Sequence, residues 1–257
     1  MSKHELVVVP DKHDQRDLIM NRHLDYTRNG RPLPRHSDLR PHMPKIQNQG
    51  QTGSCTGHAI AACMEYDMMA HHQQELDLSR LFIYYNERWS EGTQRSDAGG
   101  EIRDGIKTIA KYGACEEIVW PFNPTHLRHK PSEEAYAAAV RHRAVLYERV
   151  PQTEEAIAYV LGVERRPIVM GIYVYESFES DETAKTGKIP MPDVKNEKCV
   201  GGHAVVLAGH DLDQGDGILR NSWGEEWGMK GYGDIPMAYV LNRRLTSDLW
   251  TVRKLTT

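Results

Sequence analysis

Cysteine is scarce in this 257-residue chain, and none of its four cysteines belongs to a CxxC pair. The four are widely separated, at Cys55, Cys63, Cys115 and Cys199, which predicts neither a zinc site nor a disulfide framework. Long apolar runs are missing too. No stretch approaches the roughly 20 apolar residues of a membrane helix. The apolar run at residues 6–9 is shorter than the roughly 7–15 residues of a signal peptide. We therefore expect a reducing, cytoplasmic compartment, although export without a signal peptide stays open.

A strong charge of either sign is also absent, since 32 basic and 36 acidic residues leave a formal charge of −4. This balance argues against a nucleic-acid binder that relies on backbone electrostatics. Hydrophobic residues make up 39% of the chain and charged residues 26%, as in an ordinary globular protein. We expect a monomer with no metal, no cofactor, no nucleic-acid partner and no membrane partner. The length allows one sizeable domain or two small lobes that share a cleft.

The first half of the chain has a helical pattern and the second half a strand pattern. Apolar periodicity and capping residues predict helices over residues 54–68, from Ser79 onward, over 103–112 and over 132–146. Runs of β-branched and aromatic residues predict strands at 168–175, 204–208 and 218–220. Two lobes of different class imply a cleft between them. Residues 1–30 show no sustained period and end in a turn signal, so we treat them as an N-terminal extension.

Cys55 is a candidate nucleophile because it follows a Gly-Ser turn and opens a predicted helix. The N–H groups and the dipole at a helix start lower a thiol's pKa, although a cysteine there can equally be buried and inert. A thiolate needs a base, and the base needs an orienting group. His203 differs from most of the 13 histidines because two glycines precede it and an apolar run follows. Asn221 lies in a turn-rich segment, but local pattern alone leaves a capped core histidine and a turn asparagine equally open.

Several motifs resemble those of the papain-like cysteine peptidases. Residues 48–55 read NQGQTGSC, similar to the family's Gln-to-Cys segment. Residues 202–205 read GHAV, and residues 221–228 read NSWGEEWG, followed by GYG at 231–233. A Gly-Gly pair at 99–100 and the sequence DLR at 38–40 also resemble family motifs. The motifs cover residues 31–233 in the family's order.

The resemblance implies an α+β, papain-like fold with two lobes and the active-site cleft between them. The peptidase domain would cover residues 31–257, with a helical lobe at about 42–145 and a β-barrel-like lobe at about 146–257. The implied activity is that of a cysteine-type endopeptidase, which hydrolyses peptide or protein substrates through an acyl-enzyme thioester. The alternatives are an acyl transferase or amidase acting on a non-protein substrate, and a catalytically silent binding module. The presence of all four expected catalytic residues argues against the silent module.

The resemblance also assigns roles to individual residues. Cys55 would attack the scissile carbonyl, His203 would protonate the leaving amine, and Asn221 would orient the imidazole. Gln49 would donate to the oxyanion together with the backbone N–H of Cys55. Substrate contacts would come from a glycine wall at P1, an apolar P2 pocket and a tryptophan over the His–Asn pair. These residues are, respectively, Gly99 and Gly100; Ile102, Gly171 and Ala204; and Trp223.

The chain departs from the family pattern at two positions near the nucleophile. Thr52 stands where a disulfide-forming cysteine is usual, and Thr56 stands where an aromatic residue is usual. The extension at residues 1–30 is shorter than a typical prosegment. Two outcomes stay open for it. It lies on the surface as a belt or tail, or its apolar run blocks the cleft until the chain is cut near residues 28–31.

Overall fold

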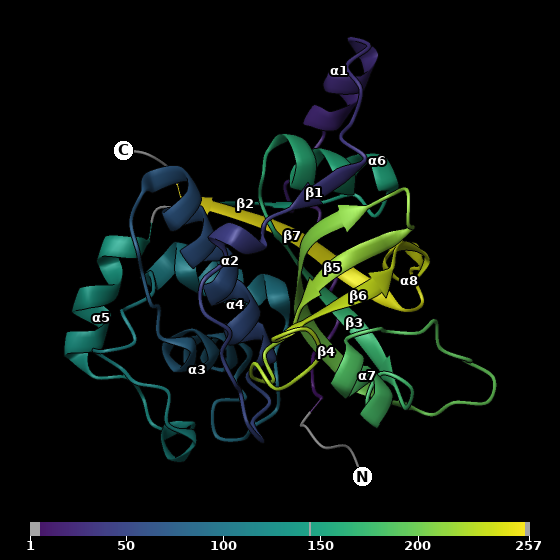
Figure 1. Cartoon of the computed structure of the whole chain (residues 1–257). Helices are drawn as coiled ribbons and strands as arrows, with labels where there is room; N and C mark the ends of the chain where they lie inside the picture. The colour runs from purple at the N-terminus through teal and green to yellow at the C-terminus, as the bar shows by residue number, and fades with distance from the viewer. Residues whose placement is uncertain (1–5, 144, 255–257) are drawn as a thin grey trace.

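The structure, a computed structural model, describes residues 6–143 and 145–254, and places helices and sheet in two different lobes (Figure 1). The helices of the first lobe are α2 (Cys55–His72), α3 (Arg80–Glu91), α4 (Ile102–Tyr112) and α5 (Glu133–Ala139). The strands are β1 (His36–Asp38), β2 (Val145–Arg149), β3 (Ile168–Tyr175), β4 (Cys199–Asp211), β5 (Asp216–Arg220), β6 (Tyr232–Pro236) and β7 (Thr246–Lys254). They pair antiparallel in the order β2-β7-β3-β4-β5-β6, with β1 joined to β4. The expected two-lobed fold is confirmed; the sheet is not closed, so the second lobe is barrel-like only in a loose sense.

The helices of the first lobe begin and end largely where their capping residues predict. Cys55 is the first residue of α2. Ser79 caps α3 by accepting the Phe82 N–H at 3.0 Å, and Gly113, with φ of 83°, ends α4. The predicted helix over residues 132–146 is wrong at its end. It stops at Ala139, continues as a short 3₁₀ turn, and gives way to β2, because this stretch completes the sheet edge next to β7.

In the second lobe, β3 has the predicted limits, whereas β4 and β5 are longer than predicted. Glycines and histidines flank the apolar run of β4 on both sides, and the pairing with β3 and β5 continues through them. The sequence did not predict β1, β2, β6 and β7, which are short, polar or marked only by weak local sequence signals. The same holds for the short helices α1 (Arg22–Arg28), α6 (Glu154–Ala158), α7 (Asp181–Thr186) and α8 (Met237–Leu241). In Figure 1, α1 projects from the body of the molecule, so the extension does contain a helix.

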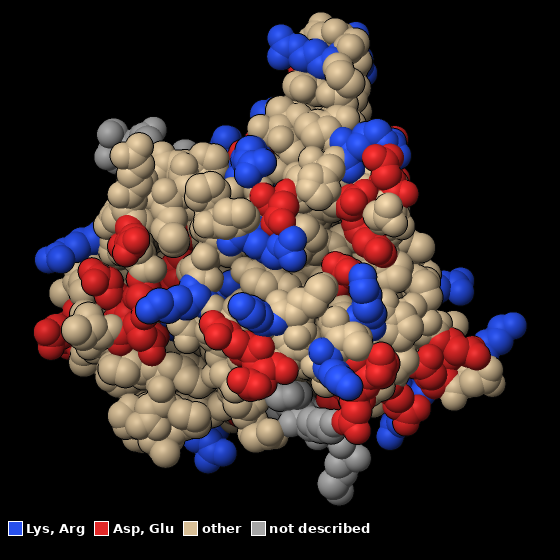
Figure 2. All heavy atoms as spheres, viewed as in Figure 1, with Lys and Arg blue, Asp and Glu red and all other residues tan. Residues whose placement is uncertain are grey.

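One apolar core joins the two lobes. Buried side chains of α2, such as Ile60 and Met64, belong to the same cluster as Val205 of β4 and Trp250 of β7. The contact holds the start of α2 against the middle of the sheet. Acidic and basic side chains are interspersed on the surface shown in Figure 2. No helix in the described part of the chain has the length and apolar character needed to cross a membrane.

Candidate active site

Cys55 lies in the first turn of α2 with its side chain buried. Burial is the largest influence on the thiol and raises the pKa of Cys55 to about 12, while the backbone N–H groups of Ala204, Thr56 and Cys55 itself act in the opposite direction. The lowering expected from the N–H groups at the helix start is present, but burial outweighs it in this covered state of the site. Removing a thiol from water outweighs three backbone donors.

The sheet brings His203 and Asn221 together. His203 Nε2 lies 2.8 Å from Asn221 Oδ1, and both side chains are buried. The same oxygen accepts the Ser222 N–H at 2.8 Å, which keeps it facing the ring. Nδ1 is then the imidazole nitrogen turned away from Asn221. The antiparallel pairing of β4 with β5 produces this contact between residues 18 positions apart.

Aromatic side chains cover the histidine. Trp223 stacks on the His203 ring with centroids 4.9 Å apart and planes at 22°. Phe178 and Trp227 meet Trp223 edge-on, at 5.6 and 5.8 Å. The His203–Asn221 contact is therefore shielded on this side, and a hydrogen bond in such surroundings is stronger than in water. Phe178 was missed from the sequence because no local motif marks it.

Gln49 is fixed at both ends of its amide. Its Nε2 donates to the Thr52 carbonyl at 2.7 Å, and its Oε1 accepts the Ser222 hydroxyl at 2.6 Å. The side chain is fully buried. An amide nitrogen carries two hydrogens, so Nε2 has a second N–H that can serve a developing oxyanion. A donor held in place before the reaction is the type that stabilises such charge.

Cys55 and His203 come from opposite lobes. The Cys55 sulfur lies within hydrogen-bond reach of the Ala204 N–H, which lowers its pKa. Ala204 directly follows His203 in β4, so the start of α2 and the histidine strand meet at this point. The nucleophile and base candidates are thus neighbours in space, although 148 residues separate them in the sequence.

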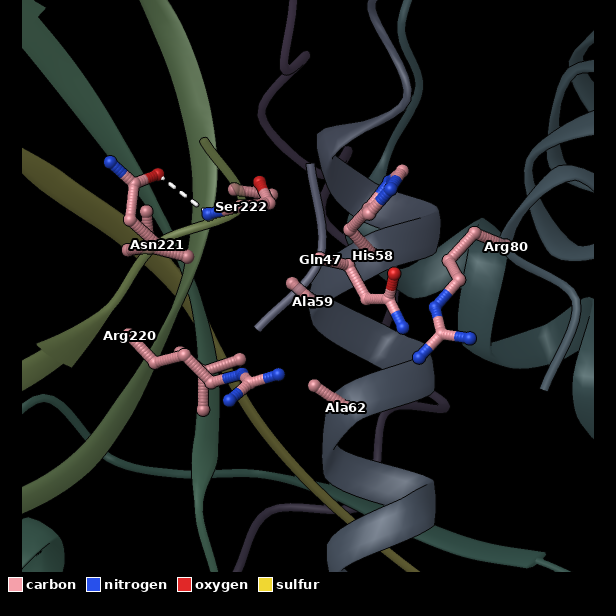
Figure 3. Close-up of a pocket in the computed structure, with 11 residues that line it drawn as sticks. Gln47, His58, Ala59, Ala62, Arg80, Arg220, Asn221 and Ser222 are labelled. Atoms are coloured by element: carbon pink, nitrogen blue, oxygen red, sulfur yellow. Dashed lines mark hydrogen bonds between the residues drawn. The ribbon is translucent and has the colours of Figure 1, made fainter. Parts of the chain in front are cut away.

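A small cavity lies under the site, between α2 and the sheet (Figure 3). His58 and Arg80 line it from the helical lobe, and Arg220 and Asn221 line it from the sheet. Its volume of about 10 Å³ is enough for roughly one water molecule. Burial lowers the pKa of His58 to about 3, so this histidine is neutral at pH 7. The cavity is too small for a substrate, which must bind on the other side of the site.

That side is covered by residues 6–9 of the chain itself, which we call the strap. The Val8 N–H donates to the Gly202 carbonyl at 3.0 Å, and the Val9 N–H donates to the Gly100 carbonyl at 3.1 Å. The strap therefore adds an extended segment between the two lobes, paired through its backbone. One of its two partners, Gly202, directly precedes the candidate base.

The expected glycine wall is covered by the strap. A Cβ on Gly99 would overlap the backbone oxygen of Val7, and Gly99 has φ of +69°. A Cβ on Gly201 would likewise overlap the backbone of Leu6. These positions require glycine because another backbone approaches them closely. The surface at this glycine pair therefore accepts an extended chain.

The expected P2 pocket is occupied by Val8. A Cβ on Gly171 would lie 3.6 Å from both Val8 Cγ1 and Ile102 Cδ1. Gly171 pairs with Ala204 across β3 and β4, so the three expected pocket residues do lie together. Ser247 also faces this space, 3.4 Å from the same point. It was missed because it lies in a strand that the sequence did not predict.

The residues that depart from the family pattern make hydrogen bonds. Thr52 Oγ1 donates to the Gln49 carbonyl at 2.8 Å and lies 2.7 Å from Ser54 Oγ. Thr56 Oγ1 donates to Glu87 Oε2 at 2.6 Å. All four cysteines are free thiols. Buried hydroxyl contacts therefore connect the loop and helix around the nucleophile.

Asp11, which follows the strap and Pro10, is firmly anchored. The Asp11 N–H donates to Asp248 at 3.0 Å. The fully buried carboxyl group of Asp11 lies 2.7 Å from Trp250 Nε1, 3.0 Å from the Arg103 N–H and 3.0 Å from Arg149 Nη2. Burial, with help from Asp248, raises the pKa of Asp11 to about 7. The part of the extension around Asp11, which we call the belt, is thus built into the fold. No local sequence signal indicates this feature.

Comparisons with known proteins agree with this fold. The sequence model described as papain family cysteine protease matches residues 33–244. An uncharacterized peptidase C1-like protein of Acanthamoeba polyphaga mimivirus is 40% identical, over 81% of this chain and 70% of its own length. A cysteine protease of Blomia tropicalis is 29% identical, and the alignment covers 79% of this chain and 61% of that protein. The crystal structure of xylellain, a cysteine protease from Xylella fastidiosa, superposes with a TM-score of 0.89 and 34% identity, covering 99% and 98% of the two chains.

Proposed function

Because the chain belongs to the papain family of cysteine proteases, we propose that Cys55, His203 and Asn221 hydrolyse peptide bonds in peptide or protein substrates, assisted by Gln49. The observation that carries this proposal is the 2.8 Å contact between His203 Nε2 and Asn221 Oδ1. That contact leaves Nδ1 as the nitrogen available to the nucleophile. His203 lies in β4, the strand that also brings the N–H group of Ala204 to the Cys55 sulfur.

The mechanism has an acylation half and a deacylation half. As the thiolate of Cys55 attacks the scissile carbonyl, a C–S bond forms and the charge moves onto the carbonyl oxygen. Gln49 Nε2 and the Cys55 N–H stabilise that oxyanion. The C–N bond then breaks, and the imidazolium of His203 gives its proton to the leaving amine. In the second half, His203 takes a proton from water, the hydroxide attacks the thioester, and the C–S bond breaks to release the acid.

A polypeptide fits this cleft better than a small amide does. The strap shows how an extended chain pairs there, through the carbonyls of Gly100 and Gly202. Its Val8 side chain lies beside Gly171 and Ile102. We therefore expect a substrate to bind through its backbone, with an apolar side chain at P2. Backbone pairing of this kind provides affinity, and the pockets for side chains provide specificity.

The strap keeps the cleft of the full chain closed in this proposal. It occupies both carbonyls that would hold a substrate, and it covers a thiol whose pKa burial raises to about 12. A cut at residues 28–31 would not release it, because Asp11 and Met20 remain buried against the sheet lobe. The strap is then an anchored inhibitor that opens by local movement, rather than a prosegment removed by one cleavage.

A reducing compartment, such as the cytoplasm, is supported by the four free thiols, including exposed Cys199. We propose that the chain acts there as a monomer without nucleic acid. Thiol trapping in intact cells, followed by mass analysis, tests the first point, and light scattering of the purified chain tests the second. Disulfide-linked Cys199 or a stable dimer would contradict the respective proposal.

An epoxysuccinyl inhibitor tests the catalytic assignment. We expect it to modify Cys55, located by mass spectrometry of the Cys55 peptide, and we expect Cys55→Ala to abolish peptidase activity. Cys63→Ala is the matched control, because it removes another buried thiol from the same helix. Wild-type turnover by Cys55→Ala would end the assignment.

A further inference from the structure

Glu87 of α3 is a fully buried carboxyl group behind the active site. Its Oε2 accepts the Thr56 hydroxyl at 2.6 Å, and Thr56 is the residue directly after Cys55. Among the described residues, none makes a hydrogen bond to Glu87 Oε1. A buried polar atom without a partner is uncommon and calls for an explanation. The explanation we consider is that the position of this carboxyl group serves the neighbouring site.

The same side chain supports the backbone on which an extended chain lies. A Cβ on Gly100 would overlap the Glu87 carboxyl group, and a Cβ on Gly105 of α4 would lie 3.3 Å from Glu87 Cδ. The Gly100 carbonyl is the group that accepts the Val9 N–H at 3.1 Å. Because interiors are close-packed, a displaced Glu87 would displace Gly100 as well.

We propose that Glu87 is a positioning residue that, through Thr56, fixes the start of the nucleophile helix relative to the glycine backbone that holds the substrate. The inference rests on the proposed function, in which Cys55 is the nucleophile. It also accounts for Thr56, where related peptidases have an aromatic residue. A directed hydrogen bond between α2 and α3 takes the place of a packed ring and adds a contact to Gly100.

Burial favours the neutral form of this carboxyl group. Burial raises the pKa of Glu87 well above its usual range, and Glu91 and Asp104 act in the same direction. The Thr56 hydroxyl and Arg88 oppose them. Neutrality has a consequence for the reaction, since a charged Glu87 raises the pKa of Cys55. A neutral acid can hold Thr56 and Gly100 in place without opposing the thiolate.

Substitutions at Thr56 test the hydrogen bond in the full chain. Thr56→Val keeps the shape and removes the hydroxyl, and it should lower kcat/KM about 10-fold, as the loss of a bond worth roughly 1.4 kcal/mol would. The rate of Cys55 alkylation by the epoxysuccinyl inhibitor should fall in parallel. Thr56→Ser should restore both to within about 3-fold. Thr108→Val is the control, because it removes a buried hydroxyl that donates to a carbonyl of α4 at 2.8 Å.

Glu87→Gln separates positioning from charge. Its amide oxygen can still accept from Thr56, so kcat/KM should stay within about 3-fold of wild type. The pH at which Cys55 alkylation rises should not change, because the side chain is neutral in both proteins. Glu87→Asp, one methylene shorter, should resemble Thr56→Val. A shift of the alkylation profile to lower pH in Glu87→Gln would show that Glu87 acts as a charge and would overturn the inference.

Failure of this inference differs from failure of the proposed function. Normal kcat/KM and normal alkylation in Thr56→Val, together with an inactive Cys55→Ala, would overturn the positioning role alone. An active Cys55→Ala would overturn both. If Thr56→Val does not fold, as judged by circular dichroism, the pH profile of Glu87→Gln and the rate of Glu87→Asp decide the question.

Discussion

Removing the strap while keeping its anchor should activate the protease. A chain that starts at Pro10 after the initiator methionine lacks residues 1–9, and with them the strap, and keeps Asp11. Among the described residues, the lost contacts include two backbone hydrogen bonds, of about 0.5–1.5 kcal/mol each, the burial of Leu6 and the partial burial of Val8. Full burial of such side chains contributes about 1.5–3 kcal/mol each. Against this, ordering four residues costs about 1–2 kcal/mol per residue.

The free energy gained from these contacts and the entropic cost of ordering the strap differ by only a few kcal/mol, so the closed state is favoured only modestly. We therefore expect the shortened chain to be about 10- to 100-fold more active at low substrate concentration, since each 1.4 kcal/mol corresponds to a factor of ten. The gain should appear as a lower apparent KM, because the strap and the substrate use the same carbonyls. Leu6→Ala removes about 2 kcal/mol of burial and should produce most of the effect.

A fluorogenic peptide with an apolar P2 residue is a suitable substrate for the assay. Leu24→Ala is the matched control, since Leu24 lies in the same extension but is 45% exposed on α1. Thermal unfolding checks that the shortened chain is intact. If that chain unfolds at the wild-type temperature and has an unchanged KM and kcat, the strap has no regulatory role and the reasoning is refuted.

Four further outcomes follow from the site and the belt. Gln49→Ala should lower kcat by about 10²–10³, and it should also lower the Tm, because it removes two buried hydrogen bonds. Asn221→Ala should leave measurable activity, because orienting the base is a smaller contribution than supplying it. Burial raises the pKa of Asp11 from 3.8 to about 7, so the folded chain retains a proton that the unfolded chain releases. Its contribution to stability therefore falls as pH rises from about 4 to 7, and Asp11→Asn should flatten that part of the urea-unfolding profile. A chain starting at Arg31 should have a lower Tm than one starting at Pro10, because it lacks Asp11, whose buried carboxyl group contacts Trp250 and Arg149.

The sequence predicts those parts of the fold that depend on local signals. Ser79 and Gly113 mark helix ends because capping is decided within a few residues, and β3 is a run rich in β-branched and aromatic residues that is bounded clearly enough to predict. The pair His203 and Asn221 follows from motif resemblance. Its geometry could not be predicted, because the register between β4 and β5 places the two side chains together. Register is a property of the whole sheet.

The state of Cys55 shows why local reasoning was insufficient. A helix start lowers a thiol's pKa, and that expectation considers only the groups within one turn. The structure adds a nonlocal influence, since the folded chain buries Cys55 completely. Desolvation then exceeds the effect of the backbone donors. Opening the strap should restore water to the site, so the thiol's pKa should fall in the shortened chain.

The position of Pro10 explains how an anchored segment can still open. Proline has no N–H to donate and a fixed φ, so the backbone pairing of the strap ends at Val9. The next residue, Asp11, belongs to a separate set of contacts with Trp250 and Arg149. Movement of residues 6–9 therefore breaks none of the Asp11 contacts. A short tether holds a segment at an effective concentration on the order of millimolar, so the strap competes well with dilute substrates and poorly with abundant ones. We therefore expect a comparison of several substrates at one concentration to show a difference between the two chains. The rate of the full chain should depend more strongly on the affinity of the substrate than the rate of the shortened chain does.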